Sequence, residues 1–205
     1  MNELILKGGP IMYVLILCSI LGVYIGVQKF LFLRSHRISN KLFLDKIKHQ
    51  LVTHGKQETI KELRTNRKIM VKGILAGIAL ADYSRSEIKE RSQEALNLEI
   101  SKLEKNMTIL SSIITVAPIL GLLGTVLGLM DIFNVISGGG IGDSSVLSAG
   151  IAKALVTTVA GLSIAIPFIF LKTFLNYQIE SFIADMEKSL LDIASYCKRT
   201  AGVSS

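Results

Sequence analysis

The chain contains three long stretches in which apolar residues predominate and charged residues are absent. They lie between Lys7 and Lys29, between Lys105 and Asp131, and between Lys153 and Lys172, and they are 21, 25 and 18 residues long. About 20 mostly apolar helical residues cross a bilayer core, so each stretch is long enough, or nearly so, to span a membrane. All 39 charged side chains lie in the other 141 residues. The pattern predicts an all-α membrane protein with three transmembrane helices.

From these stretches and the charges around them we predict seven segments. They are a periplasmic N-terminus at 1–9, spans at 10–33, 106–136 and 146–172, a cytoplasmic helical loop at 34–105, a periplasmic glycine-rich turn at 137–145 and a cytoplasmic helical tail at 173–205. The orientation follows from Lys and Arg, which mark the cytoplasmic side of a membrane. Of the 23 in the chain, 16 lie in residues 34–105, so we expect the N-terminus outside and the C-terminus inside.

Three shorter helices are expected between the first and second spans. The apolar spacing indicates them at 40–51, 58–64 and 69–80. The last is apolar but too short to cross a bilayer, so we expect it within a small cytoplasmic helical bundle. In the first span, Gly22 and Gly26 form a pair of small residues that would allow another helix to approach closely.

Two of the spans are expected to extend far into the cytoplasm. Apolar residues from Leu96 to Leu110 keep a spacing of three and four without interruption, which predicts one continuous helix over 86–136. The same spacing from Leu175 to Cys197 continues the third span to about Lys198. Such narrow apolar stripes are typical of helices that pack against each other or against copies of themselves.

The net charge of +7 adds little to this picture, because all of it lies in residues 34–105. A surface for single-stranded nucleic acid needs aromatic side chains among the basic ones, and this segment has only Phe43 and Tyr83. The two cysteines have no metal-binding or disulfide spacing, and the three histidines all lie in the same segment without a catalytic pair. We expect no nucleic-acid partner, no metal, no cofactor and no enzymatic activity.

Polar side chains within a bilayer need a partner or water, so the hydroxyl groups of the spans are the candidates for function. In the second span one helical face carries the hydroxyl residues Ser111, Thr115 and Thr125, and it is flanked by Gly121, Gly124 and Gly128. In the third span a face of small residues is formed by Ala154, Thr158, Gly161 and Ala165, and Thr157 lies beside it. We expect the glycines to permit close helix packing.

These hydroxyls have a structural and a functional interpretation. Many hydroxyls in membrane helices simply bond to a carbonyl one turn earlier, and we favour this for Ser112, Thr157 and Ser163 taken singly. For Thr125 and Thr158 together we favour the lining of a polar pathway or a partner-binding surface. The candidate pathway residues are Thr125, Thr158, Thr157, Thr115 and Ser111.

The three uncharged stretches contain no Asp, Glu or His. A protein that moves protons through a membrane normally needs a titratable group in the path. If this chain conducts ions, we therefore expect another subunit to supply the carboxylate.

Two segments resemble the signature of the MotA/TolQ/ExbB ion-channel family, on its ExbB/TolQ branch. They are Pro118-Ile-Leu-Gly-Leu-Leu-Gly-Thr-Val-Leu-Gly-Leu-Met130 and Gly150-Ile-Ala-Lys-Ala-Leu-Val-Thr-Thr-Val-Ala-Gly-Leu-Ser-Ile-Ala-Ile-Pro167. The resemblance extends to nearly the whole chain, because three spans, a large cytoplasmic loop and a helical tail are also the topology of that branch.

The resemblance implies a specific assembly and function. Members of this branch form homopentamers in the bacterial inner membrane, and their second and third spans line a central pore. The pore holds the single membrane helix of an ExbD- or TolR-like partner, whose aspartate carries the translocated H⁺ or Na⁺. The complex couples the ion gradient to mechanical work, acting on a TonB- or TolA-like protein. By position in the motifs, Thr125 and Thr158 match the pore threonines that face this aspartate.

Lys153 departs from the pattern, because the branch commonly has glutamate there. A cation at the outer end of a pore-lining helix repels H⁺ and Na⁺, unless it pairs with Asp131, Asp143 or a partner carboxylate. The alternative function is a non-conducting membrane scaffold that assembles cytoplasmic partners on its helical stripes. An intramembrane enzyme is disfavoured because no catalytic pair lies in the spans.

Overall fold

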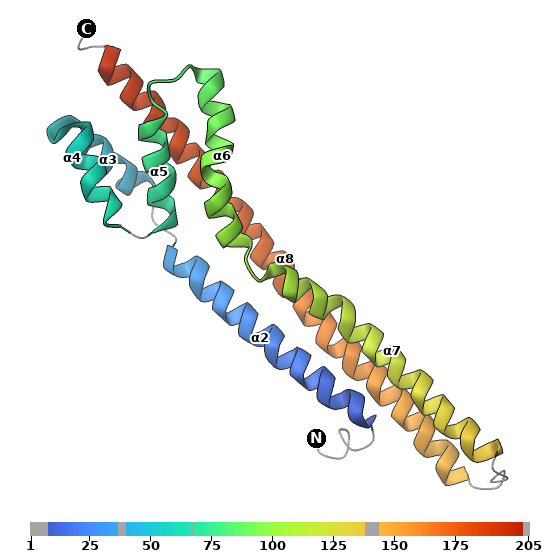
Figure 1. The fold of residues 1–205 in the computed structure, drawn as a ribbon. Helices are drawn as coiled ribbons and strands as arrows, with labels where there is room; N and C mark the ends of the chain where they lie inside the picture. Colours follow the sequence, from blue (N-terminus) through green and yellow to red (C-terminus); the bar gives the residue numbers. More distant parts are fainter. Residues whose placement is uncertain (1–7, 37–39, 67, 138–143, 203–205) are drawn as a thin grey trace. The chain divides into compact units, whose positions relative to one another are not determined.

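The structure, a computed structural model, describes residues 8–36, 40–66, 68–137 and 144–202. These residues are helical almost throughout and include no β-strand, as Figure 1 shows. The helices are α2 (Pro10–His36), α3 (Asn40–Thr53), α4 (Gly55–Arg64), α5 (Ile69–Ala79), α6 (Arg85–Glu104), α7 (Met107–Ser137) and α8 (Ser144–Gly202). The expected all-α class is confirmed. Most of the expected N-terminal segment 1–9 and of the turn 137–145 lies outside the described residues.

Among the described helices, three are long and apolar enough to cross a membrane. The qualifying segments are Pro10–Ser35, Met107–Ser137 and Leu147–Thr200. They coincide with the three uncharged stretches, so length and composition support the three predicted spans. α5 has 11 residues and is too short to span a bilayer, as expected.

Contacts within the chain divide it into two compact units. The first comprises Met1–Lys29 and Asn106–Leu175, and the second comprises Phe30–Lys105 and Asn176–Ser205. α2 and α8 therefore contribute residues to both units. The first unit contains the apolar part of each candidate span, and the second contains α3, α4, α5 and α6.

In the first unit, α7 and α8 approach so closely that backbone contacts backbone. A β-carbon at Gly121 would lie 2.9 Å from the carbonyl oxygen of Thr157, and one at Gly161 would lie 2.5 Å from that of Ala117. No side chain fits at such distances, so glycine at these positions permits the packing. α2 packs on α8 through a side chain instead, because a β-carbon at Gly22 would lie 2.5 Å from the ring of Phe168.

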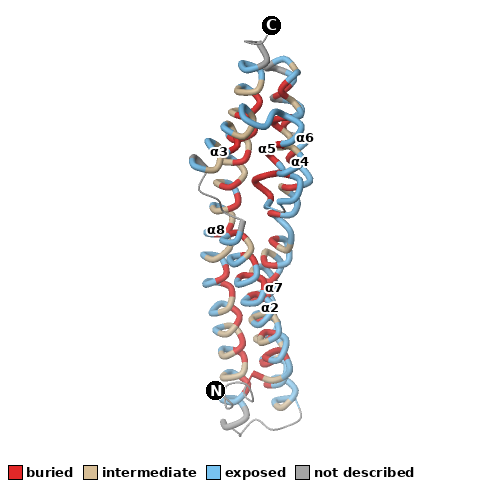
Figure 2. Tube along the Cα trace, turned by 90° about the vertical axis from the view of Figure 1, so that its left-hand side faces the viewer, coloured by how far each residue is buried: buried red, intermediate tan, exposed pale blue. Residues whose placement is uncertain are grey.

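The second unit has a conventional apolar core. Its buried side chains recur along α8 every three or four residues, as do the buried positions of the helix in Figure 2. The fully buried members include Ile47, Val71, Ile74, Ile78, Leu96, Leu103, Met186, Leu190 and Ile193. The predicted apolar stripe along the tail is therefore confirmed, and α8 is one uninterrupted helix from Ser144 to Gly202.

The prediction of one continuous helix over 86–136 is wrong. α6 ends at Glu104 and α7 begins at Met107, because Asn106 adopts a left-handed backbone conformation with φ of 69°. Asparagine tolerates this conformation better than most residues, and the Asn106 side chain donates a hydrogen bond to Gln28 Oε1 at 3.2 Å. Of the two spans that were expected to continue far beyond their apolar stretch as unbroken helices, only the third does so.

Apolar spacing did not reveal this break because the stripe continues on both sides of it. Leu103 and Leu110 are both fully buried, and Met107 is nearly so. The start of α6 is better marked, since Ser84 and Glu87 form a capping box in which each side chain bonds the other residue's backbone N–H.

Candidate functional site

Thr157 lies at the contact between α7 and α8. Its side chain is fully buried, and its hydroxyl lies within hydrogen-bond distance of the carbonyl oxygens of Ala154 (3.0 Å), Lys153 (3.2 Å) and Gly121 (3.3 Å). Gly124 contacts the same side chain, because a β-carbon there would overlap it. Thr157 therefore fills the contact between the two helices and does not reach the surface of the chain.

Thr158 lies at the edge of this contact. It is half-buried, and its hydroxyl donates to the Gly121 carbonyl oxygen at 3.3 Å. Its predicted companions on a smooth face, Ala154, Gly161 and Ala165, are all buried. The small-residue face of α8 is thus used for packing, and Thr158 is the member that remains partly accessible.

The hydroxyl face of α7 is only partly covered by other parts of the described chain. Ser111 and Thr125 are half-buried and Thr115 is exposed. Each bonds within its own helix: Thr125 donates to the Leu122 carbonyl at 2.6 Å, Ser111 to the Met107 carbonyl at 3.0 Å and Thr115 to the Ser111 carbonyl at 3.2 Å. A hydroxyl has one donor and two acceptor lone pairs. With the donors occupied, these oxygens retain the capacity to accept hydrogen bonds from outside the chain.

The five glycines of the two motifs all lie between α7 and α8. In addition to Gly121, Gly124 and Gly161, a β-carbon at Gly128 would lie 2.8 Å from the Gly150 carbonyl oxygen. The contact therefore extends along α8 from about two turns before Thr157 to one turn after it.

Lys153 forms an ion pair with Asp131. The ammonium nitrogen lies 2.6 Å from Asp131 Oδ2, and the two side chains are 26% and 58% exposed. The partners considered for Lys153 were Asp131, Asp143 and a carboxylate of a partner protein. In the structure Lys153 pairs with Asp131 of α7, and Asp143 lies outside the described residues. The charge of Lys153 is therefore compensated within the chain.

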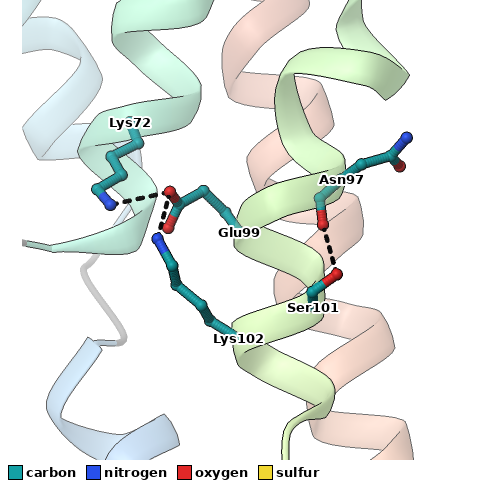
Figure 3. Close-up of polar contacts among 5 residues, drawn as sticks. All are labelled: Lys72, Asn97, Glu99, Ser101 and Lys102. Carbon is teal, nitrogen blue, oxygen red and sulfur yellow. Dashed lines mark hydrogen bonds and ion pairs between the residues drawn. The ribbon is translucent and has the colours of Figure 1, made fainter.

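A second ionic cluster, which sequence reasoning missed, lies in the second unit (Figure 3). Glu99 of α6 accepts hydrogen bonds at Oε1 from Lys72 of α5 at 2.8 Å and from Lys102 at 2.9 Å. Burial opposes ionisation of Glu99, but the hydrogen bonds from the two lysines outweigh it and hold the pKa of this carboxyl below its usual value. Its other oxygen, Oε2, is buried and has no hydrogen-bond partner.

A sequence signal for this cluster existed. Glu99 lies three residues after Leu96 and four before Leu103, both fully buried, so it is on the core side of α6. A charged side chain on that side needs a counter-charge. The spacing predicts the burial of Glu99, although it does not identify Lys72 as the partner.

No group of three or more His, Cys, Asp or Glu side chains gathers into a metal site in the part of the chain that the structure describes.

Comparison with known proteins agrees with the motifs. Residues 36–188 match the MotA/TolQ/ExbB proton channel family. A putative biopolymer transport protein ExbB homolog of Methanothermobacter thermautotrophicus is 28% identical over 186 residues, covering 90% of this chain and 66% of that protein. The putative biopolymer transport protein ExbB-like 3 of Synechocystis is 30% identical over 189 residues, covering 90% of this chain and 89% of that protein.

A Tol-Pal system protein, TolQ of Haemophilus influenzae, is 32% identical over 107 residues, which cover 52% of this chain and 47% of that protein. The chain thus spans about two thirds of the Methanothermobacter relative and nine tenths of the Synechocystis one. The match to the family covers both signature segments and three quarters of the chain. The chain belongs to the MotA/TolQ/ExbB proton channel family, on its ExbB/TolQ branch, and is a multi-pass membrane protein with an ExbB/TolQ-like role in energising transport.

Proposed function

We propose that this chain is the pore-forming subunit of an ion-driven motor complex in a bacterial inner membrane. The observation that carries the proposal is the hydroxyl face of α7, which the described chain covers only in part although α7 is mainly apolar. A polar face in a membrane helix requires a partner or water. An ion pathway shared with another subunit supplies both.

Thr125 and Thr158 are the proposed pathway residues. Both are partly accessible, and both have a backbone carbonyl for their single donor. Their oxygens can therefore accept a hydrogen bond from a protonated carboxyl group, from water or from hydronium. Ser111 and Thr115 continue the same face of α7. Thr157 is proposed to support packing rather than line the pathway, because it is fully buried.

The carboxylate is proposed to come from an ExbD- or TolR-like subunit with a single membrane helix. The uncharged stretches of this chain contain no titratable Asp, Glu or His, whereas movement of H⁺ or Na⁺ needs such a group. We propose a homopentamer around this partner, with the N-terminus periplasmic and residues 34–105 and the tail cytoplasmic. The excess of Lys and Arg in 34–105 supports this orientation. The output is proposed to reach a TonB- or TolA-like protein.

The test removes the two hydroxyls without changing side-chain shape. Thr158→Val and Thr125→Val should each lower ion flux by about tenfold or more, equivalent to about 1.4 kcal/mol in the barrier, because valine offers no acceptor. Flux is measured in liposomes that contain the full chain copurified with its partner. The mass of the intact purified complex gives the subunit count in the same preparation.

Thr173→Val is the matched control. Thr173 lies on α8, as Thr158 does, is exposed and donates a hydrogen bond to the Ile169 carbonyl oxygen at 2.9 Å. It lies outside the proposed pathway, so flux should be unchanged. Normal flux in both pathway variants, together with the absence of a single-span partner from the complex, would contradict the proposal. That result would favour the non-conducting scaffold.

A further inference from the structure

Asp131 is the only carboxylate among the described residues of the first unit. Its partner, Lys153, is one of three cations there, with Lys29 and Lys172. The pair joins α7 to α8 at 2.6 Å. The proposed function gives neither residue a role. Charged side chains on membrane helices are costly, and they usually mark a functional site.

The backbone geometry brings these two side chains together. Gly128 and Gly150 allow α7 and α8 to touch next to the pair, and a β-carbon at Gly150 would overlap Ile132, the neighbour of Asp131. On the other side, a β-carbon at Gly9 would lie 3.1 Å from Cε of Lys153. Gly9 has a φ of +68°, which favours glycine. The missing side chain leaves room for the lysine beside the start of α2.

The pair lies next to the proposed pathway, on the side of the turn between α7 and α8. Asp131 follows Thr125 by six residues and Lys153 precedes Thr158 by five, which is about 8 to 9 Å along each helix at 1.5 Å per residue. In the proposed orientation this is the periplasmic side, from which the ion arrives. An ion that reaches the two threonines therefore passes close to the pair.

We propose that Asp131 and Lys153 form a charge gate at the outer end of the ion pathway. This inference rests on the proposed function and concerns its regulation. The ammonium group of Lys153 carries the same charge as the translocated ion and occupies the carboxylate that would otherwise attract that ion. While the pair is closed, the carboxylate is not available to an incoming cation; when it separates, Asp131 attracts the cation.

The exposure of the pair is suited to a gate that opens. Asp131 is more than half exposed in the chain, so neighbouring side chains do not hold the pair closed. The helix contact around the pair relies on glycines and Ile132 rather than on the charges. Variants of either residue are therefore expected to fold.

The test depends on the sign of two effects. Lys153→Gln frees Asp131 and should raise flux several-fold, whereas Asp131→Asn leaves an unpaired ammonium that repels cations and should lower flux several-fold. The charge exchange Asp131→Lys with Lys153→Asp should restore flux towards the wild-type level. Flux is measured with the full chain and its copurified partner in liposomes, and circular dichroism verifies folding of each variant.

Lys172→Gln is the matched control, because it removes a cation from the same helix and the same unit without touching the pair; its flux should equal that of the wild type. A purely structural link between α7 and α8 predicts that both single variants change flux in the same direction, and this result would overturn the gate. If the wild type conducts no ions, the proposed function fails and the gate with it. If it conducts and the two single variants agree in sign, the gate alone fails.

Discussion

The two units of the chain use the same spacing of apolar residues but bury different side chains. In the second unit the buried positions are large, such as Ile74, Leu96 and Ile193. In the first unit the contact between α7 and α8 is made mainly by glycine, alanine and threonine, while Ile119 and Leu155 are 57% and 62% exposed. The first unit also buries some large side chains, such as Leu15 and Leu110, but its closest helix contact is made by small residues.

The physical reason is the solvent of each unit. In water, large apolar side chains gain most by leaving the solvent, so they form the core. In a bilayer the lipid tails are as apolar as leucine, and helices associate instead by van der Waals packing of small residues and by hydrogen bonds. The charges follow the same division, because four of the five ion pairs among the described residues lie in the second unit.

The largest effect expected from this comparison comes from a matched pair of substitutions. Ile193→Ala empties part of the second unit's core and should destabilise it by about 2 to 5 kcal/mol. Ile119→Ala removes the same atoms from an exposed site and should change stability by less than about 0.5 kcal/mol. Thermal unfolding of the full chain in detergent, followed by far-UV circular dichroism, measures both. Equal losses in the two variants would contradict the comparison.

An intermediate effect is expected in the first unit. Gly161→Ala places a carbon 2.5 Å from the Ala117 carbonyl oxygen, so the helices must separate, at a cost of about 1 to 3 kcal/mol. Alanine is the better helix former by about 1 kcal/mol, so a net loss in the same unfolding assay isolates the steric effect. Ala149→Val, at an exposed position of α8, is the control and should have little effect. An unchanged melting temperature for Gly161→Ala would show that α7 and α8 are not held this closely.

The smallest effect concerns the pH dependence of the second unit. The pKa of Glu99 is lowered in the fold from 4.5, so its ionised form stabilises the native state at neutral pH. This contribution is lost as the pH falls through the lowered folded pKa. Glu99→Gln should therefore lose less stability than the wild type between neutral pH and about pH 3.

The Glu99 prediction has a control based on the lysines. Replacing both Lys72 and Lys102 by Met removes the interactions that lower the pKa of Glu99 and leaves burial, which raises it. The contribution of Glu99 to the pH dependence should then reverse its sign. Urea unfolding at several pH values measures the slope of stability against pH. Parallel slopes for the wild type and Glu99→Gln would mean that Glu99 does not contribute to acid sensitivity.

Much of the fold was predictable from sequence because apolar spacing reports directly on local structure. The uncharged stretches predicted the three long apolar helices, and helices at 40–51 and 69–80 were predicted to begin where α3 and α5 do. The unbroken tail was also predicted. The two glycine-rich segments were sufficient to identify the family, since they carry the contact surface of α7 and α8.

The candidate site was only partly predictable. Spacing placed Thr125 with Ser111 and Thr115 on one face of α7, and these side chains remain at least partly accessible in the chain. It could not separate Thr157 from Thr158, which are adjacent in sequence but differ in burial. Both hydroxyls lie 3.3 Å from the same carbonyl oxygen of α7, that of Gly121, and the two residues differ in how deeply each enters the contact between the helices.

By itself the sequence determined which segments are helical, which are suited to lipid and which family the chain belongs to. The tertiary structure decided the rest: the break at Asn106, the burial of Thr157, the pairing of Lys153 with Asp131 and the two lysines on Glu99. Periodicity describes the faces of a helix, whereas each of these features depends on the chain it packs against. The contacts of Lys153 with Asp131, of Lys72 with Glu99 and of Asn106 with Gln28 join residues 22, 27 and 78 positions apart, and only folding brings them within reach.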